Sequence, residues 1–223
     1  MVYLAVLAGI LIVGGLGLTS VIAKNMAPSQ KRLKMETQRL KEDMDQWVGT
    51  LVPINKEELE LFSLGQEKQV LRKGITTTAK GIYTTIYHEP VLAYSYREYI
   101  GKEDKRNALL YARTAEHSFI YWIRKGVATL FIDDQEVGTL NKEGILRGKR
   151  TGKAIAERSS AQQAMIPVKV GSREVGNLSL PSEASSKGLH DRAFNFLKAD
   201  LNDKEEQLFL ALALEAMVKE VVK

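Results

Sequence analysis

Apolar residues follow three successive patterns along this chain. An uncharged run covers residues 1–23, a thin stripe at helical spacing follows over 30–47, and alternating β-branched and aromatic positions begin near 74. As a helix rising ~1.5 Å per residue, the first run spans roughly 34 Å, enough to cross a hydrocarbon layer of about 30 Å. These patterns predict a membrane anchor, a stalk helix and a β-rich domain.

A cleaved secretory signal is the alternative for the first run. Such a signal begins with a cation and carries an apolar stretch of about 7–15 residues, whereas the first cation here is Lys24 and the run is longer. Cations then dominate residues 24–41 against the single acid Glu36. Because short loops rich in Lys and Arg stay cytoplasmic, we expect the N-terminus outside and the rest of the chain in the cytoplasm.

Small residues recur on successive turns of the predicted anchor, at Ala5 and Gly9 and again at Gly15 and Thr19. Small side chains let a second helix approach closely. The anchor is therefore expected to contact a membrane-protein partner or a second copy of the chain, although glycine is also common in membrane helices in general.

The segment 24–53 is expected to be a basic juxtamembrane stalk helix with a linker. Pro28 or Ser29 is suited to start the helix, and Gly49 and Pro53 are suited to end it. The apolar stripe consists of Leu33, Leu40, Met44 and Trp47. Glu36 and Asp43 occupy the positions that would complete a coiled-coil seam, so the stalk is expected to lie on the membrane or on the domain.

Residues 54–223 are expected to form one β-rich domain. A short helix is predicted over 57–64, and a strand is expected to begin near 70–71. Period-two stretches rich in β-branched and aromatic residues predict further strands at 75–79, 81–87, 91–99, 108–113 and 119–123.

An internal repeat follows these strands. Segments 127–140 and 165–178 share one plan, in which a strand, a tight polar turn and a second strand containing Glu-Val-Gly-x-Leu succeed one another. Gly138 and Gly176 are expected to mark a bulge or bend in each copy.

The C-terminal segment predicts a short helix over 191–201 and a strong one over 203–222. Asn202 and Glu205 form a capping box for the second. Its body over 208–214 is apolar on all sides, which is typical of a helix buried by protein and is too short to span a bilayer. The expected fold class is therefore membrane-anchored α+β: one transmembrane helix, a stalk helix and an antiparallel, barrel-like β domain with a buried C-terminal helix.

Candidate chemistry is sparse. The three histidines, His88, His117 and His190, each adjoin an acid but lack metal-ligand spacing, and the absence of cysteine excludes thiol catalysis. The segment 148–153 differs from a phosphate-binding loop, which needs four residues between its glycines and a Ser or Thr after the Lys. We expect no catalytic residue, cofactor or metal.

Charge suggests what the domain binds. The formal net charge of +5 comes largely from the juxtamembrane stalk, and cations beside a bilayer attract anionic headgroups by ~1 kcal/mol each. A second cationic segment lies between 147 and 158, for which a solvated turn is the alternative. Nucleic acid is not expected, because no face combines cations with interleaved aromatics. The residues expected to contact lipid or an acidic partner are Lys31, Arg32, Lys34, Arg147, Lys149, Arg150 and Lys153.

Repeated hairpins with Val-Gly-x-Leu strands, closed by an apolar Leu-Ala-Leu-Ala helix, resemble the tubby C-terminal-like superfamily, which includes scramblase and LURP-type proteins. The resemblance covers about half of the chain and implies a barrel over 119–180 around a central helix at 208–222. It implies a lipid-facing or scaffolding module, but no calcium loop matches, so scrambling activity does not carry over.

Residues 74–120 also resemble the GIDE-type domain of membrane-anchored ubiquitin ligases and their prokaryotic relatives. The resemblance rests on Gly74-Ile75-Thr76-x-Thr78 and on Glu89-Pro90-Val91-Leu92-Ala93-Tyr94-x-Tyr96, followed by Thr114 and Phe119. Ligase activity belongs to a separate zinc-binding module that needs cysteines, which this chain lacks.

The function expected from the sequence is therefore non-enzymatic. The first hypothesis is an accessory or structural subunit of a membrane complex. The alternative is a peripheral binder of anionic lipid headgroups, and a membrane-anchored hydrolase is the least favoured hypothesis.

Overall fold

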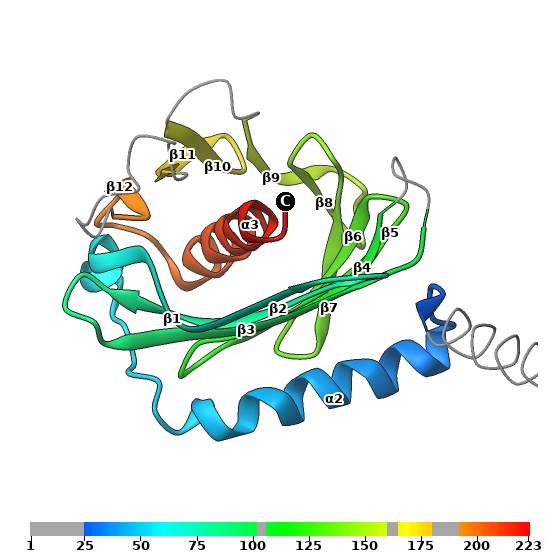
Figure 1. Ribbon diagram of the computed structural model, residues 1–223. Helices are drawn as coiled ribbons and strands as arrows, with labels where there is room; N and C mark the ends of the chain where they lie inside the picture. The colour runs from blue at the N-terminus through cyan, green and yellow to red at the C-terminus, as the bar shows by residue number, and fades with distance from the viewer. Residues whose placement is uncertain (1–24, 102–105, 160–164, 180–191) are drawn as a thin grey trace, which may run out of the picture.

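The computed structural model describes residues 25–101, 106–159, 165–179 and 192–223, and this part of the chain forms one twelve-stranded antiparallel sheet with helices on both of its faces (Figure 1). The helices are α2 (Gln30–Val48), the 3-10 helix η1 (Lys56–Leu61) and α3 (Asp203–Val221). The strands are β1 (Phe62–Lys73), β2 (Thr77–Thr85), β3 (Pro90–Tyr99), β4 (Asn107–Arg113), β5 (Ser118–Arg124), β6 (Val127–Ile132), β7 (Gln135–Leu140), β8 (Ile145–Gly148), β9 (Ala154–Arg158), β10 (Met165–Val170), β11 (Arg173–Ser179) and β12 (Phe194–Leu197).

The sheet curls into a nearly closed barrel. Each strand pairs with its neighbours in sequence, from β1 through to β12. The two edge strands then approach each other, because the backbone N–H of Ala193 donates to the carbonyl of Phe62 at 2.8 Å and Ser63 forms an isolated antiparallel bridge with Arg192. The expected antiparallel, barrel-like β domain is confirmed.

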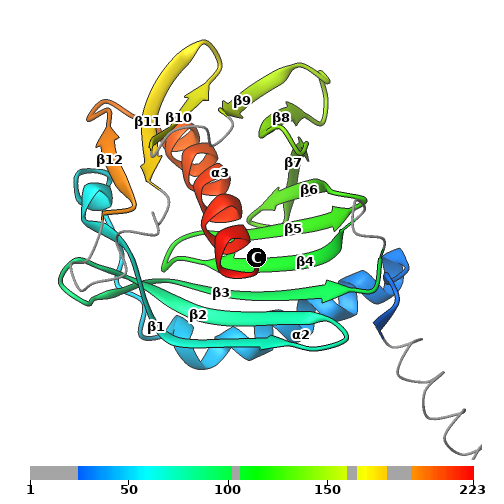
Figure 2. The same ribbon diagram turned by 45° about the horizontal axis from the view of Figure 1, so that its top comes forward.

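Helix α3 fills the barrel (Figure 2). Its start is fixed by the predicted capping box, in which Asn202 Oδ1 accepts from the N–H of Glu205 and Glu205 Oε2 accepts from the N–H of Asn202, both at 3.0 Å. Every residue from Leu208 to Leu214 is buried. A helix that is apolar all round has no face suited to water, so it becomes the core around which the sheet wraps.

Aromatic rings tie the two edges of the sheet to this helix. Phe62 on β1 lies 5.1 Å from Phe194 on β12, and Phe194 lies 4.9 Å from Phe209 on α3, edge to face. Tyr83 extends the row on β2. Within the described residues, these rings thus join the two edges of the sheet beside the backbone contacts of Ala193 and Ser63.

Helix α2 lies outside the barrel, along strands β3 and β4 (Figure 1). Ser29 caps its start and Gly49 caps its end, as expected. Its apolar stripe packs on the outer face of the sheet, against Ile82, Ala93, Leu109, Tyr111 and Ile120. The stalk helix therefore lies on the domain, one of the two placements that the sequence left open.

The internal repeat forms two equivalent hairpins, β6–β7 and β10–β11. In the first hairpin Gly138 pairs with Leu130, and in the second Gly176 pairs with Val168. The register of each hairpin shifts directly after this pair. A Cβ on Gly138 would lie 1.9 Å from the carbonyl oxygen of Arg147, and one on Gly176 would lie 2.7 Å from that of Phe196. Both glycines mark bulges, as predicted, because a neighbouring strand passes where a side chain would stand.

Two predicted elements are wrong. Residues 75–79 and 81–87 are not separate strands, because β2 runs through Gly81, whose missing side chain leaves room for the ring of Tyr94. The helix predicted over 191–201 is replaced in its described part by β12, which pairs with β11 and directs Phe194 into the core.

Other elements differ from the prediction in their type or in their first and last residues. The helix predicted over 57–64 is the 3-10 helix η1, and β1 begins well before residue 70. Strands β8 and β9 were not predicted, and the two ends of the cationic segment 147–158 lie in them. In the described residues no helix is long and apolar enough to cross a membrane; the predicted anchor, with Ala5, Gly9, Gly15 and Thr19, lies outside them.

Candidate functional site

The turns of the barrel lie at two ends, because successive antiparallel strands alternate in direction. One end, called here the entry end, carries the turns at 74–76, 125–126 and 141–144. The other, the distal end, carries those at 86–89, 114–117, 133–134 and 149–153. The two ends differ in which part of the chain reaches them.

The described chain begins at the entry end. The N–H of Ile100 donates to the carbonyl of Asn25 at 2.6 Å, and Arg124 Nη2 donates to the carbonyl of Pro28 at 3.2 Å. In Figure 2 the start of the described chain, in blue, lies beside the point where β3 ends. Whatever precedes residue 25 therefore joins the domain at the entry end.

Several exposed apolar side chains lie at this end, whereas Tyr87, 67% exposed, lies at the distal end. Met26, Ile75, Val127 and Met165 are all exposed, Ile75 by 64%. They stand at the first bridge of the chain, at the tip of the β1–β2 turn, at the start of β6 and at the start of β10. Single exposed apolar residues need no explanation, but several at one end of a barrel form a surface.

Cations accompany these apolar tips. Lys73, Arg124, Lys125 and Lys142 are exposed at the entry end, against the exposed acid Glu143. Among the other acids at this end, Glu98 pairs with Arg106 at 3.0 Å and Glu220 pairs with Lys223. The entry end thus combines apolar tips with an excess of positive charge.

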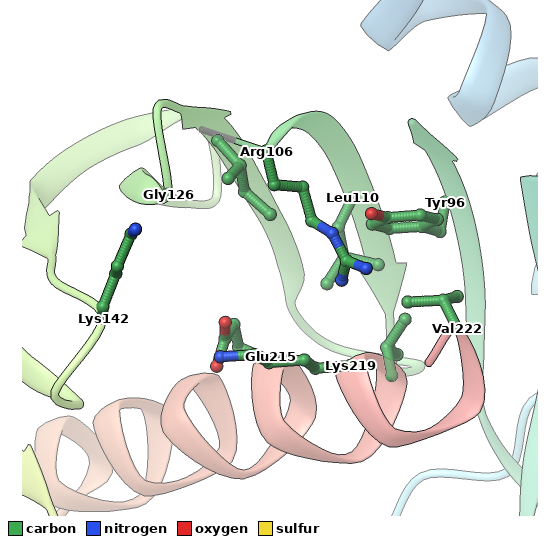
Figure 3. Close-up of a pocket in the computed structure, with 10 residues that line it drawn as sticks. Tyr96, Arg106, Leu110, Gly126, Lys142, Glu215, Lys219 and Val222 are labelled. Carbon is green, nitrogen blue, oxygen red and sulfur yellow. The ribbon is translucent and has the colours of Figure 1, made fainter. Parts of the chain in front are cut away.

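A pocket of about 310 Å³ lies at the same end, between the C-terminal half of α3 and strands β3 to β5 (Figure 3). Its apolar wall comes from both sides, from Leu110 and Ile123 on the sheet and from Val218 and Val222 on the helix. Its polar lining consists of Tyr96, Arg106, Lys142, Glu215 and Lys219. The volume is at the lower end of the range for small-molecule sites, about 300–1,000 Å³.

Tyr96 brings an unpartnered hydroxyl to the pocket wall. The residue is 4% exposed, and its hydroxyl oxygen has no hydrogen-bond partner among the described residues. Burial, reinforced by Glu98, raises the pKa of Tyr96 well above its ordinary value. The hydroxyl is therefore a protonated donor at neutral pH, and leaving it unpaired costs about 1–3 kcal/mol.

Glu215 forms an ion pair with Arg158. Arg158 Nη2 lies 3.0 Å from Glu215 Oε2, and Arg158 Nη1 donates to the carbonyl of Leu212 at 2.9 Å. The pair is held by charge, since Oε2 accepts no hydrogen bond of ordinary geometry within the described part of the chain. The carboxylate of Glu215 is thus paired with Arg158, as the guanidinium of Arg106 is with Glu98.

The pocket cations are placed by the turns. The backbone N–H of Gly126 donates to the carbonyl of Arg106 at 3.0 Å, which fixes the β5–β6 turn beside that arginine. Gly126 has φ +79°, and a Cβ there would lie 2.2 Å from Cε of Lys142. The positive φ favours glycine at this turn, whereas the flexible Lys142 side chain could move aside for a Cβ.

The cations predicted from the sequence do not form one site. Lys31, Arg32 and Lys34 lie in the first turns of α2, near the entry end. Arg147 lies on β8, and Lys149, Arg150 and Lys153 lie in the turn at 149–153, at the distal end. Lys149 pairs with Glu136 at 2.7 Å, and Arg147 Nη1 donates to the carbonyl of Gly152 at 3.3 Å.

Arg32 takes part in a buried cluster on the outer face of the sheet. Glu36, 3% exposed, lies 3.0 Å from Arg97, 3.1 Å from Arg39 and 3.8 Å from Arg32. Tyr99 lies under Arg97, with the guanidinium 5.6 Å from its ring centroid. In the sequence, the only indication of this cluster is that an acid, Glu36, lies within the apolar stripe of α2.

The two histidines within the described residues lie apart from the pocket. His117 Nδ1 lies 2.7 Å from Asp133, and its Nε2 lies 3.2 Å from the amide nitrogen of Gln207, so both ring nitrogens are engaged at the distal end. His88 lies 4.0 Å from Glu67, and His190 is outside the described residues. No group of three or more metal-ligating side chains occurs within the described ranges.

Comparison with protein-family models, curated proteins and solved structures finds no match to this chain. The resemblances to the tubby-like and GIDE-type families stay predictions.

Proposed function

We propose that this protein is a non-enzymatic, single-pass membrane protein that rests the entry end of its barrel on an anionic bilayer. The observation that carries the proposal is the convergence, at one end, of exposed apolar tips, exposed cations and the start of the described chain. Residues 1–23, uncharged and long enough to span, would hold that end against the membrane.

The chemistry of the entry end suits a lipid surface. Apolar tips such as Ile75 and Val127 gain by entering the headgroup layer, and each nearby cation adds ~1 kcal/mol with anionic lipids. A tether raises the effective concentration of the surface. Contacts that would be weak for a free domain therefore suffice to orient an anchored one.

The proposal moves the lipid contact from the loop expected in the sequence to the opposite end. A bilayer at the entry end leaves Arg150 and Lys153, at the distal end, directed away from the headgroups. Lys31 and Lys34, in the first turns of α2, remain near the bilayer in this orientation.

The orientation is testable with single-site labels, because the chain contains no cysteine. Ile75→Cys and Val127→Cys place an environment-sensitive dye at the entry end, and Tyr87→Cys places the same dye on an exposed distal turn. Full-length protein in nanodiscs with nitroxide-labelled lipid should show strong quenching at the first two sites and little at the third. Removal of the anionic lipid should weaken quenching at the entry end.

Equal quenching at the two ends, or stronger quenching at Tyr87→Cys, would overturn the proposed orientation. Carbonate extraction of native membranes provides the separate test of the anchor. Release of the protein into the supernatant would contradict a transmembrane segment.

A second candidate function is a subunit of a membrane complex, favoured by the exposed cations at the distal end. Arg150 and Lys153 are exposed in the turn at 149–153, a position suited to an acidic partner facing the cytoplasm. Gentle detergent extraction followed by size-exclusion chromatography and mass spectrometry tests it. Stoichiometric companions lost from Arg150→Gln/Lys153→Gln protein would support this function, and a lone monomer would reject it.

A further inference from the structure

We propose that the open edge of strand β1, over residues 70–73, binds an extended segment of a second protein in which two acidic residues adjoin two apolar ones. The segment would add one strand to the sheet, a recurrent mode of peptide recognition. Such a site is independent of the proposed bilayer orientation. The backbone of this edge, its charges and its exposed apolar side chains each favour this kind of partner.

Strand β1 has a single neighbour along most of its length. It stands first in the strand order and pairs with β2. Within the described residues, the backbone of the other edge of the sheet meets it only at Phe62 and Ser63. In Figure 2, β1 is the outermost strand on its side of the sheet. Every second residue of an edge strand directs its N–H and C=O away from the sheet, so these groups are placed to pair with another strand.

The edge is regular only near its end. Residues 70–73 pair one for one with residues 77–80, whereas the register shifts twice before Val70, and Lys68 has φ +51°. Bulges of this kind protect an edge strand from further pairing. The stretch that can accept a new strand is therefore short, from Val70 to Lys73.

The charge of the edge selects an acidic partner. Arg72 and Lys73 are exposed, and neither side chain forms an ion pair within the described ranges. Opposite charges on neighbouring strands attract each other, and like charges repel. A second copy of the chain is therefore disfavoured, because the three cations of β1 would meet the same three cations, and Glu67 is the only acid on the strand.

Apolar side chains complete the pattern. Val70 and Leu71 are 38% and 39% exposed. Adjacent strand residues point to opposite faces, so Val70 and Arg72 share the outer face, where both line a groove beside α2. Leu71 and Lys73 share the other face. Each face thus combines one apolar residue with one cation, which suits a partner strand with two apolar residues next to two acids.

The groove on the outer face has room for the partner's side chains. It measures about 610 Å³ and lies between α2 and strands β1 to β3. Lys80, which pairs with Val70, adds a cation whose Nζ lies 5.5 Å from the ring centroid of Trp47. Glu42 and Asp43 form the wall on the side of α2. An acidic side chain is therefore favoured beside β1 and disfavoured deeper in the groove, which keeps the partner at the edge.

The experiment is hydrogen exchange, followed by mass spectrometry, on full-length protein in mild detergent. The probe is the capped peptide Thr-Glu-Asp-Val-Ile-Thr, which in antiparallel pairing places its acids beside Arg72 and Lys73. We expect slower exchange at 70–73 with the peptide and no change at the turn 149–153. The peptide Thr-Lys-Lys-Val-Ile-Thr should have no effect.

Backbone methylation of the probe tests strand pairing separately from side-chain contact. Alternate N–H groups of the added strand face β1. N-methylation at one of the two central residues of the acidic peptide should therefore abolish the protection of 70–73, and N-methylation at the other should leave it.

Charge reversal tests the side-chain contacts, with the Kd measured by fluorescence anisotropy of labelled peptide. Arg72→Gln should raise the Kd of the acidic peptide about two- to fivefold. Arg72→Glu/Lys73→Glu should raise it by about tenfold or more and make the Lys-Lys peptide the better ligand. Arg150→Glu/Lys153→Glu, the same change of net charge at exposed positions of the distal end, should bind as wild type does.

Complete protection of 70–73 before any peptide is added would show that the edge is already covered, and would overturn the proposal. So would equal protection by the acidic and the basic peptide. A dimer that the acidic peptide dissociates would assign the edge to a second copy instead.

Discussion

Helices α2 and α3 have the same length and lie on opposite faces of the same sheet, yet they are held by different physics. Each is 19 residues long. Helix α3 contacts the barrel mainly through apolar side chains, with one ion pair between Glu215 and Arg158, whereas α2 combines a narrow apolar stripe with the buried Glu36, which lies among Arg32 and Arg39 of the same helix and Arg97 of β3. The inner face of the sheet is thus a mostly apolar core with one ion pair at its side, and the outer face is a contact surface with a cluster of charges inside it.

The difference shows what each face contributes. Apolar contact has no direction, so the rotation of α3 is set by the shape of its side chains together with the few polar contacts of Arg158 with Glu215 and with the carbonyl of Leu212. A buried carboxylate between arginines has a fixed geometry and is costly if its partners are lost. The outer cluster therefore fixes the register of α2 on β3, and with it the position at which the chain joins the entry end.

The largest expected effect comes from the inner face. Phe209→Ala removes the ring that joins both edges of the sheet to α3 and should lower the free energy of unfolding by about 3–5 kcal/mol. Urea unfolding in mild detergent, followed by tryptophan fluorescence, measures it. Phe196→Ala, on the exposed side of β12, should cost less than about 0.5 kcal/mol; equal losses would contradict the aromatic seam.

Removal of charge from the outer face should cost less. Glu36→Gln leaves Arg97 and its neighbours without their carboxylate and should lower the free energy of unfolding by about 1–3 kcal/mol, because the arginine heads still reach water. Glu42→Gln is the matched control, an exposed acid on the same helix. A Glu36→Gln protein as stable as the control would mean that the cluster contributes no net stability.

Loss of a helix cap should lower the free energy of unfolding by a smaller amount, and by more for α3 than for α2. Asn202→Ala breaks a reciprocal capping box and should cost about 1 kcal/mol. Ser29→Ala removes a single hydrogen bond of 3.5 Å to the N–H of Arg32 and should cost about 0.5 kcal/mol, the lower end of the range for loss of a cap. The same urea titrations compare the two variants, and a larger loss from Ser29→Ala would reverse the ranking.

The last effect, a pH dependence on the outer face, develops only in alkaline solution. Burial, with Glu36 adding to it, raises the pKa of Tyr99 to about 12, against about 10 in the unfolded chain. Below pH about 10 the phenol is protonated in both states; as pH rises from about 10 to about 12, only the unfolded chain ionises, so stability falls. Tyr99→Phe should therefore lose less stability than wild type between about pH 8 and about pH 11.

The exposed Tyr87→Phe provides the comparison for this measurement. Its alkaline loss of stability should match wild type more closely than that of Tyr99→Phe. Identical alkaline profiles for wild type and Tyr99→Phe would contradict the burial argument.

The sequence predicted the inner face better than the outer one, for a physical reason. The capping box at Asn202 and the all-round apolar body of α3 are local signals, and both are confirmed. The bulges at Gly138 and Gly176 were also readable, because a repeated glycine in a strand indicates a close approach. The arginines around Glu36 were not, since Arg97 lies far along the chain and only the fold brings it to α2.

The pocket and the entry end escaped prediction for the same reason. Ile75, Val127 and Lys142 lie in three different turns, and their meeting depends on the alternation of strand direction around the barrel. Local propensity also predicted the wrong element at 194–197. These residues form a strand that pairs with β11, and the ring of Phe194 packs against Phe62 across the seam. A cationic run such as 147–153 is visible in a sequence, but the end of the barrel to which it belongs is not.

The helix that fills the barrel is synthesised after every strand of the described sheet. Every strand pairs with its neighbours in sequence, so each hairpin can form as soon as its two strands have left the ribosome. The apolar inner face of the sheet, however, stays uncovered until residues 203–221 emerge. Until then the nascent domain is a ribbon of aromatic surface that chaperones can bind. A chain that stops before Asp203 would have all its strands and no core, so quality control would meet an unfolded protein rather than a shortened one.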